Sequence, residues 1–376
     1  MKQKVIIFIG HFLPGYKSGG PVVSVQNLID TFSDKVDFFV VTNPRDINSQ
    51  ENYKGIRIDE WNNLNGYNIF YTNLDALSPT QIKNLCSNFD YVYCCCFYGM
   101  YVVKLMRLFK KNKIKNLIIA SMGVFLPNAL KIKSIKKKTY IWMLKVLGLF
   151  KNIVWSVTDE QEKYSIEKII KTNKDIIVAC DLPSHPVSSI KNHKQTNVLR
   201  IVYLSRIVKN KNLLFAIKAL KNCTKENIEF DIYGFIEDND YWQLCQTELN
   251  QLSQNIKYNY KGPVNHNNVM DVFMQYDLFV FPTMSENFGH VIYEAMASSC
   301  PPLISNNTYW QNLQEKKAGV CIDINNENDY SSKIIEFYNN RSMLDDYKKG
   351  AREYALAFYE ESKRTSGYKV LFNIKD

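Results

Sequence analysis

Two glutamates stand close together in the segment SENFGHVIYEAMASSCPPLIS, residues 285–305, where seven residues separate Glu286 from Glu294. A strand-like run at 278–283 precedes them, so we expect Glu286 in a loop and Glu294 about two turns into the following helix, roughly 12 Å along eight helical residues. Each carboxylate can accept hydrogen bonds from two sugar hydroxyls, and the first N–H groups of the helix can face a phosphate. The spacing favours a site that grips two parts of one extended ligand. An ordinary amphipathic helix with two exposed glutamates is the alternative.

A pair of cations forms the second candidate site, in the segment LSRIVKNKN at residues 204–212. Arg206 and Lys211 flank a short loop after a predicted strand. A forked guanidinium and a mobile ammonium together suit a diphosphate. Two exposed surface cations are the alternative interpretation of the same loop.

Two glycine-containing loops of the first half also follow predicted strands. Gly19 and Gly20 lie just before a predicted helix, where backbone N–H groups can approach an anion closely. The loop lacks the G-x-G-x-x-G spacing of a dinucleotide site. The segment ASMGVFLPNALK, residues 120–131, ends another strand at Gly123. Ligands of doubly wound sheets sit beyond the carboxyl ends of the strands, so these loops are predicted to lie at ligand-binding edges.

Short apolar runs alternate with helical patterns along the whole chain. The predicted strands lie at 5–10, 37–41, 91–96, 116–121 and 153–158 in the first half, and at 200–205, 230–234, 278–283 and 301–305 in the second. Continuous apolar strands between helices indicate parallel sheets covered on both faces.

The fold class is therefore α/β, with two Rossmann-like, doubly wound domains facing a cleft. The polar, proline-containing stretch after Asp181 is the predicted linker. It divides an N-terminal domain at 1–183 from a C-terminal domain at 184–355. The tail is predicted to be helical, with a break near 339–340, and a last helix around 356–376 is expected to pack back on the first domain.

Composition places the protein among ordinary globular proteins, since 46% of residues are apolar and 22% are charged. We find no signal peptide and no run of about 18 apolar residues, so a cytoplasmic location is expected. Nine cysteines include no C-x-x-C pair, which disfavours a zinc site. The triplet Cys94-Cys95-Cys96 is interpreted as part of a buried strand rather than a redox centre.

The net charge of +10 is concentrated in one segment, residues 104–151, which holds 13 Lys or Arg and no Asp or Glu. Subtracting these 13 charges from +10 leaves −3 for the remainder of the chain. The segment mixes lysines with Trp142 and other apolar residues, which suits contact with an anionic membrane face or an anionic acceptor. A solvated basic helix with one buried apolar side is the alternative. Nucleic acid is not an expected partner, because no recognised binding module accompanies the charge.

With these residues assembled, the chain resembles the retaining glycosyltransferases of family 4, also called group 1 glycosyltransferases, which have the GT-B fold. The resemblance extends over essentially the whole chain, and it implies that the domain at 1–183 binds the acceptor and the domain at 184–355 binds the nucleotide sugar. Residues 285–305 match the family's E-x7-E block, 204–220 its arginine–lysine diphosphate loop, and 13–21 its N-terminal glycine loop. The segment SVTDEQEK, residues 156–163, resembles the one that closes the N-terminal domain.

The resemblance implies roles for these residues. Glu286 would contact the donor sugar and support the developing charge, while Arg206 and Lys211 would stabilise the leaving diphosphate. Glu294 would hold the ribose hydroxyls of the nucleotide. The other residues implied at the donor are Asn287, Phe288, Gly289, His290, Gly19 and Gly20.

No cofactor or essential metal is implied beyond a nucleotide-sugar co-substrate. The only D-x-D match, Asp238 to Asp240, is interpreted as a turn.

Three departures from the family pattern affect the expected site. Ser299 and Cys300 precede the prolines where glycine is common, and Trp310 is expected to pack where the family has a glycine-rich loop and a glutamate. The cleft loop of the first domain has Ser121, Met122 and Gly123 in place of a histidine. His11 is a possible substitute, so His11, Met122 and Gly123 are the expected acceptor-side residues, with a capping or core role for His11 as the alternative.

The expected activity is transfer of a sugar from a nucleotide-diphosphate sugar to a glycan or lipid-linked acceptor, in assembly of a bacterial surface polysaccharide. A peripheral position at the inner face of the cell membrane would fit the basic segment. A nucleotide-sugar epimerase, a phosphorylase, and a non-catalytic nucleotide- or membrane-binding scaffold of the same fold are the alternatives.

Overall fold

A computed structural model describes residues 2–15, 18–47, 49–125, 134–170, 175–189 and 197–375. Parts of three segments singled out above lie outside these ranges: 16–17 in the glycine loop, 126–133 in the basic segment and 190–196 in the linker.

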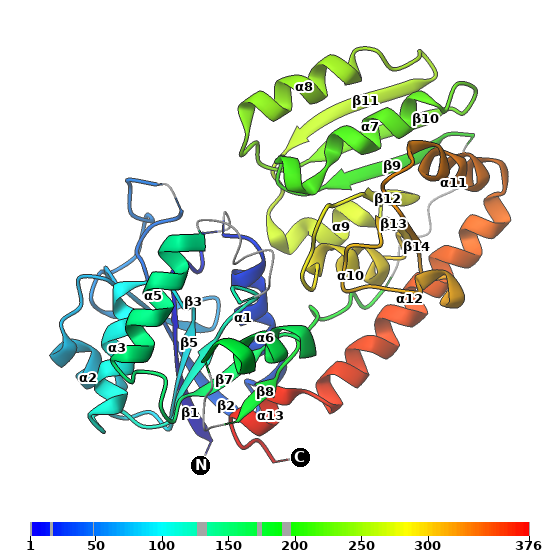
Figure 1. Ribbon diagram of the computed structural model, residues 1–376. Coiled ribbons are helices and arrows are strands. Elements are labelled where there is room, and N and C mark those ends of the chain that lie inside the picture. Colours follow the sequence, from blue (N-terminus) through cyan, green and yellow to red (C-terminus); the bar gives the residue numbers. More distant parts are fainter. Residues whose placement is uncertain are drawn as a thin grey trace. The chain divides into compact units, whose positions relative to one another are not determined.

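The chain separates into two compact units (Figure 1). Met1–Leu182 with Lys363–Asp376 form the N-terminal unit, and Pro183–Ser362 form the C-terminal unit. The sequence put the division after residue 183 and the start of the returning segment near residue 356.

The N-terminal unit is built on an eight-stranded sheet with the order β3-β4-β2-β1-β5-β6-β7-β8. Its strands are β1 (Gln3–Ile9), β2 (Val36–Thr42), β3 (Trp61–Leu64), β4 (Tyr67–Tyr71), β5 (Tyr91–Cys95), β6 (Leu117–Ala120), β7 (Val154–Val157) and β8 (Ile176–Val178). Every neighbouring pair is parallel except β3 and β4. These two strands form an edge hairpin that the predicted strands did not include. Its turn is Asn65-Gly66, with φ of 52° and 90°, as a tight hairpin requires.

Helices cover both faces of this sheet, as the continuous apolar strands predict. The helices are α1 (Gly20–Phe32), α2 (Pro79–Cys86), α3 (Met100–Lys110), α5 (Ser134–Val146), α6 (Glu160–Ile170) and α13 (Gly367–Leu371). One core joins the sheet to α1 and α13, and the other joins it to α2, α3, α5 and α6. Cys94 belongs to one core and Cys95 to the other, so the buried-strand interpretation of the cysteine triplet is confirmed for these two residues.

The C-terminal unit contains a six-stranded parallel sheet with the order β11-β10-β9-β12-β13-β14. Its strands are β9 (Leu199–Leu204), β10 (Ile228–Tyr233), β11 (Ile256–Gly262), β12 (Leu278–Phe281), β13 (Pro302–Ser305) and β14 (Val320–Ile322). Its helices are α7 (Leu213–Lys221), α8 (Asn239–Leu249), α9 (Val269–Phe273), α10 (His290–Ala297), α11 (Glu327–Asn339) and α12 (Arg341–Arg364). The break between α11 and α12 falls at Asn340, where the sequence predicts it.

The order of this sheet positions the site. From β9 the chain first builds outward through β10 and β11, and β12 then returns to the other side of β9. The loops that leave β9 and β12 therefore start from adjacent strands at the carboxyl edge. Such a reversal of strand order opens the crevice where doubly wound sheets bind ligands.

No helix among the described residues is both long and apolar enough to cross a membrane.

Candidate functional site

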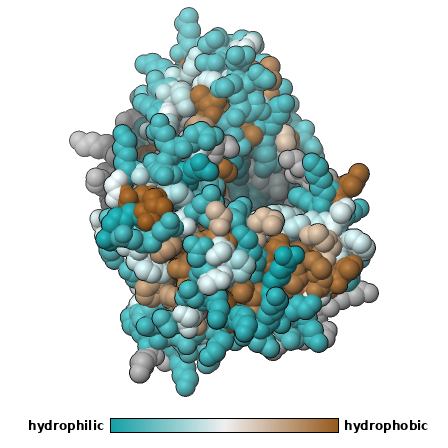
Figure 2. Space-filling model, turned by 90° about the vertical axis from the view of Figure 1, so that its left-hand side faces the viewer, coloured by the Kyte–Doolittle hydropathy of each residue, from teal (hydrophilic) through white to brown (hydrophobic). Residues whose placement is uncertain are grey.

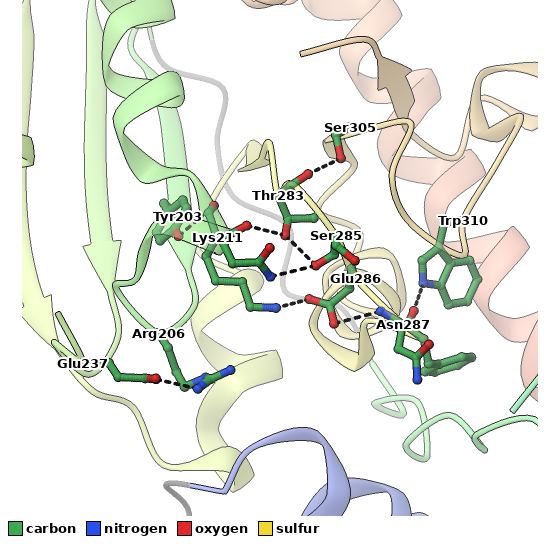
Figure 3. Close-up of polar contacts among 12 residues, drawn as sticks. Tyr203, Arg206, Lys211, Glu237, Thr283, Ser285, Glu286, Asn287, Ser305 and Trp310 are labelled. Carbon is green, nitrogen blue, oxygen red and sulfur yellow. Dashed lines mark hydrogen bonds and ion pairs between the residues drawn. The ribbon is translucent and has the colours of Figure 1, made fainter. Parts of the chain in front are cut away.

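Lys211 and Glu286 meet where the β9 and β12 loops come together (Figure 3). The Lys211 Nζ donates a hydrogen bond to Glu286 Oε2. The two side chains are only 11% and 17% exposed, so the pair is largely withdrawn from water. The Tyr203 hydroxyl fixes the backbone of Lys211 by donating to its carbonyl oxygen over 3.1 Å.

Hydrogen bonds between the two loops hold this pair in place. Asn210 Nδ2 donates to the carbonyl oxygen of Ser285 over 3.1 Å, and the Met284 N–H donates back to the Asn210 carbonyl over 2.9 Å. Asn212, whose φ is 57°, donates through Nδ2 to the Pro282 carbonyl over 3.0 Å. The position of Lys211 relative to Glu286 is therefore set by backbone contacts as well as by the ion pair.

Arg206 has a different partner from Lys211. Its guanidinium lies 2.5 Å from Glu237, and these side chains are 47% and 42% exposed. Figure 3 shows Arg206 directed toward Glu237, while Lys211 is directed toward Glu286. The alternative interpretation, two exposed surface cations, thus fits Arg206 and is wrong for Lys211, which is buried.

The turn before α10 depends on a glycine. Gly289 has a φ of 73°, and a Cβ there would lie 2.9 Å from Glu286 Cγ and 3.0 Å from Ile292 Cδ1. The Asn287 N–H donates to Glu286 Oε1 over 3.2 Å. Because Gly289 has no side chain, the Glu286 carboxylate can lie against the first turn of the helix, whose N–H groups favour anions.

His290 is the first residue of α10 and is buried. Burial, with a smaller contribution from the charge of His266, lowers the pKa of the His290 ring to about 3. The ring is therefore neutral near pH 7, with one nitrogen as donor and the other as acceptor.

Glu294 lies in the second turn of α10 and is 3% exposed. Ser184 Oγ donates to its Oε1 over 3.3 Å, and His266 Nδ1 lies 3.6 Å from the same oxygen. Burial raises the pKa of this carboxyl above its usual value, while His266 and Ser184 act in the opposite direction. Two exposed glutamates on an amphipathic helix are thus excluded, because Glu294 is buried and Glu286 nearly so. Since α10 begins only at His290, fewer helical residues separate them than the predicted eight.

Trp310 forms the aromatic wall beside this turn. It is 1% exposed, and its Nε1 donates to the Phe288 carbonyl over 2.6 Å. Its ring centroid lies 5.3 Å from that of Phe288 and 4.8 Å from that of Phe358. The predicted packing of Trp310 at this place is confirmed, and the backbone of Phe288 is held by it.

The remaining predicted residues belong to the N-terminal unit. Gly19 has a φ of 65° and precedes α1, which starts at Gly20, and a Cβ at either glycine would meet no atom within 4 Å. His11 is half-buried and its Nδ1 lies 3.0 Å from the Arg45 carbonyl oxygen, so its ring contacts the loop that leaves β2. Its partial exposure does not fit the alternative of a core residue, whereas the hydrogen bond to a loop carbonyl fits the alternative of a capping role.

Met122 and Gly123 form the turn after β6, with φ of 49° and 82°. Glu162, from the segment expected to close this domain, accepts a hydrogen bond from the Gly123 N–H over 2.6 Å. Its second oxygen accepts from the Thr158 N–H and hydroxyl, each over 3.1 Å. Burial raises the pKa of Glu162.

Sequence reasoning did not identify Asn210, Asn212, Ser184, His266 or Glu237 as part of the site. The two asparagines could have been predicted, because they alternate with lysines in the loop at 204–212 that was proposed as a site. Ser184 and His266 lie 110 and 28 residues from Glu294 in the chain, and no local spacing connects them to it.

The D-x-D match is the start of helix α8 rather than the predicted turn, because Asp240 lies in the first turn of that helix. Asp238 caps α8, and its Oδ1 accepts a hydrogen bond from the Tyr241 N–H over 3.0 Å. Within the described ranges, no group of three or more His, Cys, Asp or Glu is arranged to hold a metal ion.

Comparison with known proteins places this site in a family context. Residues 186–354 match the family model "Glycosyl transferases group 1". The match covers nearly all of the C-terminal unit and includes Arg206, Lys211, Glu286 and Glu294. It therefore supports the broad resemblance that these residues suggested.

Solved structures are similar in fold over nearly the whole chain, and one curated protein is similar in sequence over most of it. Sucrose-phosphate synthase from Thermosynechococcus elongatus superposes with a TM-score of 0.71 at 14% identity, covering 99% of this chain and 100% of that one. Anabaena Alr3699/HepE, solved in complex with UDP-glucose, gives 0.68 at 13% identity, covering 96% and 98%. A Klebsiella pneumoniae "Uncharacterized 41.2 kDa protein in cps region" is 23% identical over 314 residues, 80% of this chain and 84% of that one. The fold is the predicted GT-B fold of two Rossmann-like domains.

Proposed function

We propose that the protein is a retaining glycosyltransferase that moves a sugar from a nucleotide-diphosphate sugar to an acceptor hydroxyl. One observation carries the proposal: a nearly buried Lys211–Glu286 pair lies against the start of α10, at the switch point of a parallel sheet. A cation, a carboxylate and helix N–H groups at one point are what a phosphate-linked sugar requires.

Lys211 and the first N–H groups of α10 would stabilise the leaving diphosphate. In the reaction the bond from the anomeric carbon to the diphosphate oxygen breaks, and the acceptor oxygen bonds to that carbon. The acceptor proton passes to the released diphosphate, directly or through solvent. Negative charge grows on the diphosphate in this step, so a cation already fixed beside it lowers the barrier without reorganisation. Arg206 would add a second, exposed cation.

The two glutamates would bind the two ends of the donor. Glu286 would accept hydrogen bonds from the sugar hydroxyls and support the positive charge that develops on the sugar ring. Glu294, held by Ser184 and His266, would accept from the ribose hydroxyls. His290 would meet a sugar hydroxyl as a neutral ring, since burial lowers its pKa to about 3. Asn287, Phe288 and Gly289 would contribute backbone groups, and Gly19 and Gly20 are the proposed phosphate-binding residues of the N-terminal unit.

We propose further that the reaction needs no metal and serves assembly of a bacterial surface polysaccharide such as capsule, O-antigen or exopolysaccharide. The relative named from a cps region of Klebsiella pneumoniae supports the second point. Met122, Gly123 and His11 are the proposed acceptor-side residues.

A membrane-facing position is part of the same proposal, and α5 carries it. Ile135, Trp142 and Val146 are 80%, 64% and 66% exposed on a helix with four lysines and no acid. The side of the N-terminal unit that bears α2, α3 and α5 faces the viewer in Figure 2, and hydrophobic side chains gather in the lower half of that view. Exposed apolar side chains among lysines suit the surface of an anionic membrane.

Vesicle flotation tests the membrane contact. Replacing Lys136, Lys137 and Lys138 by glutamate is expected to abolish binding to vesicles of anionic lipid. Unchanged partition of this variant would exclude α5 as the contact.

The donor is tested by thermal stability with a panel of nucleotide sugars, comparing the wild type with Glu294→Ala. A donor at 100 times its dissociation constant is expected to stabilise the wild type by about 2.7 kcal/mol. The variant is expected to lose most of this effect. Product analysis by NMR then distinguishes a transferase, which gives a product with the donor's anomeric configuration, from an epimerase, which converts donor without acceptor. A scaffold would bind donor without turnover, and no response to any nucleotide sugar would exclude the proposal.

A further inference from the structure

The N-terminal unit contains two adjoining hollows that the proposed donor site does not use. One, of about 360 Å³, lies at the carboxyl ends of β2 and β4 and is lined by Asn43, Arg45 and Asn73 among others. The second, of about 530 Å³, lies beside α2 and the β3–β4 hairpin. Both are lined by Asp59, Leu77 and Gln81, so the two hollows adjoin, and together we call them the edge groove.

Aromatic rings line the outer part of the edge groove. Phe39, Trp61, Phe70 and Phe89 contribute to it, and Trp61 packs edge-on at 5.3 Å from both Phe39 and Phe70. Trp61 is 36% exposed because β3 is the edge strand of the sheet. The hairpin thus provides a ring surface that is fixed by its neighbours and still reaches solvent.

Polar side chains flank these rings. Asp59, Asn84 and Asn88 line the aromatic part, and within the described ranges their side chains have no hydrogen-bond partner in the protein. Arg45 and Asn73 line the other part. Positive charge is sparse, with Lys4 and Arg45 opposed by Asp59, so the groove does not suit a polyanion such as nucleic acid.

The groove also approaches a residue proposed for the acceptor. His11 contacts the carbonyl of Arg45, which lines the inner part of the groove. Asn43, from the same lining, donates to the Gly10 carbonyl over 2.8 Å. The inner part of the groove is therefore one hydrogen bond away from the loop after β1 that carries His11, within a single unit.

We propose that the edge groove binds the saccharide chain of the acceptor. Sugar rings present an apolar C–H face, which packs on an aromatic ring, and a rim of hydroxyls, which pairs with amides and carboxylates. The edge groove combines both kinds of group, the rings of Phe39, Trp61, Phe70 and Phe89 and the side chains of Asp59, Asn84 and Asn88. This inference rests on the proposed function, because it identifies the acceptor as an oligosaccharide with at least its terminal sugars recognised by the protein.

The test is binding of the full-length protein to an array of bacterial-type oligosaccharides, followed by titration of the strongest binder. Trp61→Ala is expected to weaken its affinity at least about tenfold, as truncation of a central aromatic contact does, and Trp61→Phe to restore part of it. Trp142→Ala is the matched control, since it removes another exposed tryptophan of the same unit. The double variant Asn84→Ala, Asn88→Ala changes only exposed side chains and is expected to weaken binding without affecting the fold.

Thermal stabilisation by the nucleotide sugar is measured on the same variants. If the nucleotide sugar stabilises the protein but no oligosaccharide binding depends on Trp61, the edge-groove proposal is wrong and the donor-site proposal is unaffected. If no nucleotide sugar stabilises the wild type, the proposed function itself is wrong. Equal loss of oligosaccharide binding in Trp61→Ala and Trp142→Ala would also contradict the assignment.

Discussion

Arg206 and Lys211 lie on one loop, yet their surroundings differ. Lys211 and its partner Glu286 are 11% and 17% exposed, whereas Arg206 and Glu237 are 47% and 42% exposed. The buried pair is held by hydrogen bonds from Asn210 and Asn212 to the facing loop, and the exposed pair joins two flexible side chains in water.

The difference matters because the contribution of an ion pair to the free energy of unfolding depends on how far water surrounds it. Exposed pairs contribute about 0–1 kcal/mol, since water screens them and side-chain entropy opposes them. A largely buried carboxylate that loses its cation keeps its desolvation cost, so removing one partner is more harmful. Lys211 is therefore expected to matter for both stability and catalysis, and Arg206 mainly for ligand contact.

Exchange of each cation for methionine is the strongest test of this contrast. Lys211→Met is expected to lower the free energy of unfolding by about 1–3 kcal/mol and the transfer rate by about 10²–10³-fold. Arg206→Met is expected to change the free energy of unfolding by less than about 0.5 kcal/mol. Urea denaturation and kcat/KM measure the two effects. Equal destabilisation by the two variants would show that burial does not distinguish Lys211 from Arg206.

Two glycines repeat the contrast between packed and open positions. Gly289 and Gly19 have φ of 73° and 65°, so alanine strains the backbone at either site by about 1–2 kcal/mol. Only at Gly289 does a Cβ also meet atoms, at 2.9 Å from Glu286 and 3.0 Å from Ile292. Gly289→Ala is therefore expected to cost about 1 kcal/mol more than Gly19→Ala, and to weaken donor binding by displacing Glu286. Thermal denaturation with and without donor measures the stability and the donor binding of each variant. Equal destabilisation by the two variants would show that the contacts of the added Cβ at Gly289 are unimportant.

The buried ring of His290 predicts an acid-sensitive fold. Its folded-state pKa of about 3 is below the value of 6.5 in the unfolded chain, so the unfolded state binds more protons between these values. Stability is expected to fall as pH decreases from about 6.5 toward 3. His290→Asn removes this group. The stability of this variant relative to the wild type is therefore expected to increase as pH decreases from about 6.5 toward 3. Denaturation at a series of pH values tests this, and a constant difference between the proteins would contradict it.

Glu294 should give the smallest effect, with the opposite dependence on pH. Burial raises its folded-state pKa, so its contribution to stability is present below the unfolded value and is lost as pH rises through the folded value. Glu294→Gln is therefore expected to gain stability relative to the unliganded wild type as pH rises from about 4.5. Its donor affinity is expected to fall at the same time. A variant that loses stability with rising pH would show that His266 and Ser184 outweigh burial.

Much of the fold could be predicted because the parallel strands are buried on both faces and appear as continuous apolar runs. The edge hairpin β3–β4 was missed, since its strand WNNL is polar and exposed in alternation. Its Asn65-Gly66 turn was the signal that could have revealed it.

Local sequence was also sufficient for the loops that carry Lys211, Glu286 and Glu294. Each follows an apolar strand, and the turn before α10 needs the glycine that the sequence provides at 289. The partners of these residues could not be found in this way. Ser184 and His266 reach Glu294 from distant segments, and Glu237 reaches Arg206 from the loop after β10.

The sequence by itself determined the alternation of strands and helices, the carboxyl-edge loops and the residue types that can bind a phosphate-linked sugar. The tertiary structure decided which of two similar cations is buried, that Glu294 is enclosed rather than exposed, and that an aromatic hairpin edge adjoins a polar hollow. The physical reason is that periodicity and turn chemistry act between near neighbours in the chain. Burial and charge pairing depend on which strands become adjacent in the sheet.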